Sequence, residues 1–155
     1  MRILSIALIG RQNQPLFIKS YGRPTATVEE DLKWHFVAHT SLDVFEEREA
    51  SNFRQNDHYA GLLQVMDDYA VYGYQTSTRV KIVLVLALTE ETVKDNDIKT
   101  IFKAIHNAYV AYLSNPFNES CGEGPDFVAP PIHSKKFEDK LKNIAMAQGA
   151  ELQRT

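Results

Sequence analysis

Cysteine is almost missing from this sequence, and long apolar runs are missing altogether. The one cysteine, Cys121, has no second cysteine to pair with, which fits a chain that works in a reducing compartment. No stretch approaches the roughly 20 consecutive apolar residues that cross a bilayer. The apolar run at residues 3–9 is too short for a secretory signal, and residues 10–14 are polar. We therefore expect neither an internal disulfide nor a transmembrane segment.

An excess of positive charge is also missing. The 155 residues contain 17 Lys and Arg against 20 Asp and Glu, a net charge of −3. Domains that bind nucleic acid concentrate Lys and Arg on one face, so we expect no nucleic-acid partner. The length suits a single domain, which we place at residues 1–148. We expect residues 149–155 to be a disordered tail. Residues 118–131 combine Gly, Pro and acidic residues without periodicity and should form a mobile surface loop.

The common catalytic motifs do not occur. The sequence has no GxGxxG, P-loop, GxSxG or paired-cysteine motif. Cys121 lies among acidic residues, which disfavour the reactive thiolate. Tyr69, Tyr72 and Tyr74 lack basic neighbours and are expected to pack within a sheet. We predict a protein that is not an enzyme and that needs no cofactor.

Hydrophobic periodicity predicts five strands and three helices. The strands are expected at residues 3–9, 15–21, 59–66, 69–76 and 79–88, and the helices at 32–47, 96–113 and 134–148. Residues 59–66 are ambiguous, because the same pattern fits an extension of the preceding helix. Residues 79–88 are the most apolar strand, so they should be central and covered on both faces. Gly73 indicates either a bulge or close packing.

The order of these elements predicts an α+β domain. Runs of hairpin-linked strands favour a five-stranded antiparallel sheet. One helix should cover one face of the sheet and the last two helices the other, which gives three layers. We expect the first helix to begin with a capping box formed by Thr27 and Glu30, and the second to be capped within residues 95–97.

The helix at 32–47 presents two different faces. Its core face comprises Trp34, Val37, Ala38, Ser41, Leu42 and Phe45, and its second face comprises Leu32, Phe36, His39 and Asp43. A surface helix seldom gives water a Leu and a Phe one turn apart. Either a loop of the same chain covers this second face or another protein binds it, and the sequence leaves both interpretations open.

The polar residues of the second face allow two further interpretations. His35 and His39 have the i, i+4 spacing that lets two imidazoles share a metal, but no HExxH motif or nearby cysteine completes a ligand set. His39 and Asp43 could orient an imidazole for proton transfer, although such pairs are more often surface hydrogen bonds. We therefore expect no metal, and we predict that Leu32, Phe36, His39 and Asp43 contact a partner protein.

Several segments resemble a known family. The most specific are HTSLD at residues 39–43, VYGY at 71–74 and NPF at 115–117. DNDIKTIFKAIHNAY, between VYGY and NPF, and the closing IHSKKFEDKL add to the resemblance. Together they resemble the sedlin family of small TRAPP subunits, over residues 3 to about 144. The segment at 118–131 looks longer than the family's usual connector between NPF and the last helix. Contacts that family members make through this connector are therefore not assigned to this chain.

The resemblance implies a longin-like fold, also called SNARE-like or profilin-type. It implies a non-catalytic adaptor in a TRAPP-type vesicle-tethering complex in endoplasmic reticulum–Golgi and Golgi traffic. Its partners would be other TRAPP subunits, and it would reach a Rab GTPase and the membrane only through that complex. The chain would be cytoplasmic and peripheral at the endoplasmic reticulum and Golgi. The alternative is a longin-type domain of another trafficking complex or a SNARE regulator.

Overall fold

The computed structural model describes residues 3–21, 28–50, 59–88, 93–114, 132 and 134–152. The predicted loop at 118–131, Thr27 of the predicted capping box, and Cys121 lie outside these residues.

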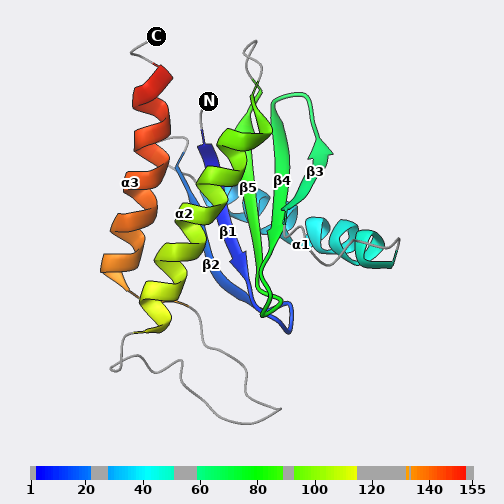
Figure 1. The fold of residues 1–155 in the computed structure, drawn as a ribbon. Coiled ribbons are helices and arrows are strands. Elements are labelled where there is room, and N and C mark those ends of the chain that lie inside the picture. The colour runs from blue at the N-terminus through cyan, green and yellow to red at the C-terminus, as the bar shows by residue number, and fades with distance from the viewer. Residues whose placement is uncertain are drawn as a thin grey trace.

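The core of the molecule is one antiparallel sheet (Figure 1). Its strands are β1 (Ile3–Ile9), β2 (Pro15–Ser20), β3 (Tyr59–Val65), β4 (Tyr69–Gln75) and β5 (Lys81–Ala87). Their order in space is β2-β1-β5-β4-β3, with every neighbouring pair antiparallel. The segment that the sequence left ambiguous is strand β3, because its residues pair with β4.

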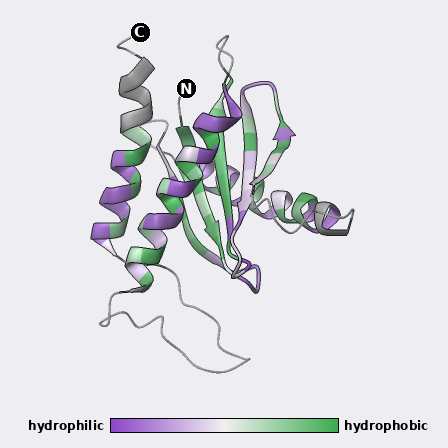
Figure 2. Cartoon of the chain, in the orientation of Figure 1, coloured by the Kyte–Doolittle hydropathy of each residue, from purple (hydrophilic) through white to green (hydrophobic). Residues whose placement is uncertain are grey.

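Strand β5 is the middle strand and is covered on both faces, as predicted. Ile82, Leu84 and Leu86 belong to the core cluster on one face of the sheet, whereas Val83 and Val85 belong to the cluster on the other. This alternation follows from the two-residue period of a strand. The colours of Figure 2 show the apolar residues concentrated on β5 and β1. The double cover explains why β5 is apolar from Ile82 to Ala87, with Lys81 at its start the one polar residue.

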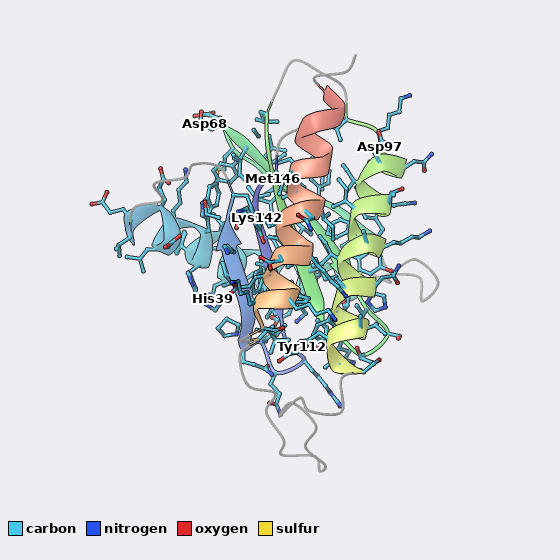
Figure 3. The ribbon with its side chains drawn as sticks, turned by 90° about the vertical axis from the view of Figure 1, so that its left-hand side faces the viewer. His39, Asp68, Asp97, Tyr112, Lys142 and Met146 are labelled. Atoms are coloured by element: carbon cyan, nitrogen blue, oxygen red, sulfur yellow. The ribbon has the colours of Figure 1, made fainter. Side chains whose placement is uncertain are left out.

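Helix α1 (Val28–Ala50) lies on one face of the sheet, and α2 (Asp95–Leu113) and α3 (Lys135–Leu152) lie on the other (Figures 1 and 3). The predicted α+β class, the five-stranded antiparallel sheet and the three layers are therefore confirmed. The strand and helix order also agrees with the longin-like fold that the resemblance implied.

Two helix ends differ from the prediction. The N-cap of α2 is Lys94, which makes no side-chain capping bond, so the predicted cap within residues 95–97 is wrong. Asp95 and Asp97 lie instead in the first turn, where a carboxylate interacts favourably with the helix dipole. Helix α3 runs to Leu152, past the predicted end at residue 148 and into the segment expected to be a tail. Residues 153–155 lie outside the described chain.

Gly73 allows α1 to approach the sheet closely. A Cβ atom built on Gly73 would lie 2.6 Å from Cζ of Phe45 and 2.6 Å from Cδ1 of Leu63. Strand β4 pairs with β5 without a register shift. In the pairing of β3 with β4, the register shifts add residues to β3 and none to β4, so Gly73 itself is not a bulge residue. Of the two roles predicted for Gly73, close packing is the one the structure shows.

Candidate functional site

The core face of α1 is buried as predicted. Its six residues are Trp34, Val37, Ala38, Ser41, Leu42 and Phe45. The hydroxyl of Ser41 donates a hydrogen bond of 2.7 Å to the Val37 carbonyl oxygen, which satisfies the one polar side chain among them. At the margin, the ammonium of Lys33 lies 5.0 Å from the ring centroids of both Trp34 and Tyr69, the range of a cation–π contact.

The second face of α1 is exposed along its whole length. Leu32 is 62% exposed and Phe36 is 69% exposed. His39 and Asp43 are exposed as well. The structure therefore brings the four predicted residues onto one face of one helix, and it does not bury them under the described parts of the chain. Cover by a loop of the same chain was one of the two interpretations left open, and the exposure of Leu32 and Phe36 does not favour it.

Helix α1 begins earlier than the pattern indicated, and this extends the second face. Val28 is the first residue of α1 and is 75% exposed. It precedes Leu32 by four residues, as Leu32 precedes Phe36, so the three side chains form one apolar stripe. The capping box predicted at Thr27 and Glu30 places the first helical residue at position 28, but the second face was defined within residues 32–47 only and so left out Val28. The repeated four-residue spacing was the signal that could have found it.

The surroundings of His35 and His39 on α1 decide whether these histidines could act in catalysis or metal binding. Among the described residues, no hydrogen bond or ion pair joins His39 and Asp43, so Asp43 does not orient this imidazole. Within the described residues, no group of three His, Cys, Asp or Glu side chains is placed to hold a metal ion. The polar groups on this face are suited to contacts at a protein surface.

The groups with perturbed pKa values belong to the sheet and its core. Burial raises the pKa of Tyr21, and the nearby Glu138 carboxylate raises it further. Burial also raises the pKa of Tyr109, Tyr69 and Tyr72. None of these tyrosines lies on the second face of α1, so their shifts reflect packing and not a site for proton transfer.

A pocket of about 300 Å³ lies between α2 and α3. Its polar lining consists of Tyr112, Ser134, Lys136 and Lys140, and Phe137 forms part of its apolar wall. Among the described residues of this lining there is no carboxylate, histidine or cysteine. Among the described helices, none is long and apolar enough to cross a bilayer.

The match to a family model covers nearly all of this architecture. The model described as Sedlin matches residues 8–147, from within β1 to within α3. The chain belongs to the sedlin family. This membership accords with the strand and helix order found above and confirms the resemblance seen in the sequence.

Curated members of the sedlin family are similar over most of their length. The Trafficking protein particle complex subunit 2-like protein of Dictyostelium discoideum is 35% identical over 92% of this chain and 96% of its own length. The protein of that name from Taeniopygia guttata is 36% identical over 91% of this chain and 95% of its own. That from Rattus norvegicus is 40% identical over 72% of this chain and 80% of its own.

The family match includes the whole of α1. Residues 8–147 contain the core face, which joins α1 to the sheet, and the second face, which the described chain leaves exposed. The second face is thus part of the family domain and not an appendage to it.

Proposed function

We propose that this sedlin-family chain is a non-catalytic subunit of a TRAPP-type vesicle-tethering complex, and that the second face of α1 is a surface through which it is held there. In this proposal the chain is cytoplasmic and reaches the endoplasmic reticulum and Golgi as part of the complex. It supports assembly, and nucleotide exchange on a Rab GTPase belongs to the whole complex.

The observation that carries the proposal is the exposure of Leu32 and Phe36 on a helix whose opposite face is core. Burying an aromatic or aliphatic side chain of this size contributes about 1.5–3 kcal/mol. A partner that covers both side chains therefore gains binding energy without disturbing the contact between α1 and the sheet. The names of the relatives, each a subunit of a trafficking particle, support the same role.

The arrangement supports an adaptor better than an enzyme. His39 and Asp43 are exposed and no hydrogen bond joins them. A catalytic imidazole is normally held by a second group that fixes its orientation. An interface needs only complementary shape and a few apolar anchors, and α1 offers these.

The test is the size of the particle that contains this chain in cells. A tagged chain is released under gentle conditions and separated by size, with the isolated recombinant chain as the reference for a monomer. We expect elution far ahead of that reference, with a constant set of companion proteins. Elution at the monomer position, without companions, would contradict the proposal.

A further inference from the structure

We propose that the segment covering the second face of α1 is basic and amphipathic, with an apolar anchor at one end and Lys or Arg side chains at the other. This inference rests on the proposed function, because it specifies the chemistry of the partner that binds the same face. The distribution of charge and apolar surface along α1 indicates this chemistry.

The apolar side chains lie towards the N-terminal half of the face. Val28, Leu32 and Phe36 are 75%, 62% and 69% exposed and follow one another every four residues. At 100° per residue they drift by only about 40° at each step, so a single apolar ridge of a partner can contact all three.

The C-terminal half of the same face is acidic. Asp43, Glu46 and Glu47 are exposed and lie within about 60° of the direction of Leu32 around the helix. Between Val28 and Glu47 the one Lys or Arg is Lys33, whose ammonium lies over the rings of Trp34 and Tyr69 at the margin of the core face. The face therefore changes from apolar at Val28, Leu32 and Phe36 to acidic at Asp43, Glu46 and Glu47, and residues 28–47 place no Lys or Arg on it.

The negative charge of the chain is concentrated on this helix. Residues 28–47 contain six Asp and Glu and one Lys, a net charge of −5, whereas the whole chain carries −3. Three of these carboxylates lie in the first turn, where the helix dipole favours them, and the other three are Asp43, Glu46 and Glu47. Glu46 and Glu47 lie near the C-terminal end of α1, which is the negative end of its dipole. A negative charge at this end of the helix interacts unfavourably with the dipole. Cations from a partner near Asp43 and Glu46 would relieve that repulsion and would steer the approach of the partner.

The rise of the helix sets a distance for the partner to match. Phe36 and Glu46 are ten residues apart, which corresponds to about 15 Å along an α-helix. The apolar anchor of the partner and its first basic side chains should be separated by about that length. A partner helix would place them roughly three turns apart.

A second copy of this chain is the rival occupant, since α3 carries four lysines, at positions 135, 136, 140 and 142. A contact between α1 of one copy and α3 of another joins two different surfaces. Such head-to-tail contacts generate rings or open chains that are built from this chain alone. Because the proposed function is assembly with other proteins, we take the occupant to be a different protein with its own basic segment.

Charge reversal tests the inference. The variant Asp43→Lys with Glu46→Lys reverses two charges on the face. Its matched control, Asp67→Lys with Asp68→Lys, makes the same change at the exposed turn between β3 and β4, at the end of the sheet where Figure 3 labels Asp68. We expect the first variant to lose companion proteins at least tenfold and the control to keep them. Raising the salt concentration should weaken the wild-type complex. Unchanged thermal unfolding of each isolated chain shows that folding is intact.

Phe36→Ala separates failure of the inference from failure of the proposed function. If Phe36→Ala releases the companions but the charge reversal does not, the second face is an interface and a basic partner is ruled out. If neither change releases the companions, the second face is not the interface and both proposals fall.

Cross-linking the complex with a carbodiimide identifies the protein that lies opposite the second face of α1. A carbodiimide joins a carboxylate to a lysine amine without a spacer. We expect cross-links from Asp43 or Glu46 to lysines of a companion protein in the wild-type complex. Cross-links to lysines of another copy of this chain would overturn the inference in favour of self-association.

Discussion

Phe36 and Phe45 lie on the same helix in opposite surroundings. Phe45 is 2% exposed, and its ring reaches the space that the missing side chain of Gly73 leaves open. Phe36 is 69% exposed and points away from the sheet. The helical period predicts this difference from sequence, because nine residues place the two side chains about 180° apart. The function of an exposed Phe cannot be predicted in the same way, since it depends on a molecule outside the chain.

Helix capping is where reasoning about single residues failed. Aspartate is a preferred N-cap, and residues 95–97 contain two. The helix nevertheless begins one residue earlier, with Lys94 at the cap and no side-chain bond. Packing of Ile98 and Ile101 into the core fixes where the first turn lies, and that tertiary contact is not visible in a local sequence pattern.

A buried tyrosine gives the residue-scale prediction. The hydroxyl of Tyr21 is buried and has no hydrogen-bond partner among the described residues. Burial, and secondarily Glu138, raises its pKa above that of an unfolded chain. The neutral phenol therefore stabilises the fold fully below pH 10, and that contribution is lost as the pH rises above 10. Tyr21→Phe should leave stability at pH 7 unchanged within about 0.5 kcal/mol.

Urea unfolding of wild type and Tyr21→Phe between pH 7 and pH 11 checks this. We expect the free energy of unfolding to fall less steeply above pH 10 in the variant, which has no phenol to ionise at that position. Parallel pH dependence in the two proteins would show that Tyr21 does not contribute to alkaline unfolding.

At the scale of elements, strong patterns were predictable and weak ones were not. Strand β5 was identified because every residue after Lys81 is apolar, which only a doubly covered strand requires. Residues 59–65 were ambiguous because short apolar runs fit a strand or a helix, and the pairing with β4 decides between them. Helix α3 extends to Leu152 beyond its last clear apolar repeat, so its end could not be located from periodicity.

Strand β5 should not tolerate charge on either face. Val83 and Leu84 are 1% and 0% exposed and belong to the two different core clusters. Val83→Asp and Leu84→Asp each bury a carboxylate without a partner, so each should lower the free energy of unfolding by about 4 kcal/mol or more. Ser77→Asp, at an exposed turn position before the strand, is the control. Cooperative unfolding of either core variant at the wild-type midpoint would contradict the assignment of β5.

At the scale of the whole molecule, the sheet separates two layers of different character. Helix α1 is acidic and leaves an apolar stripe exposed, whereas α3 carries four lysines in its first eight residues. The class, the layers and the exposed face of α1 all followed from hydrophobic patterns. The partner that binds this face could not be predicted in the same way, because the hydrophobic pattern of one chain reflects its own core and not the surface of another protein.

We predict that the second face of α1 serves binding and not folding. Phe36→Ala should therefore change the free energy of unfolding by less than about 0.5 kcal/mol, as expected for a surface position. Phe45→Ala makes the same chemical change in the core and should cost about 3–5 kcal/mol. This matched pair separates the two faces of one helix.

The most direct test is the amount of companion protein bound per folded molecule of the Phe36→Ala chain, measured together with its thermal unfolding. We predict wild-type unfolding and a loss of about 2 kcal/mol in binding, as for an interface anchor. Unfolding of Phe36→Ala at markedly lower temperature, with undiminished binding by the molecules that remain folded, would show that Phe36 belongs to the core and that the claim is wrong.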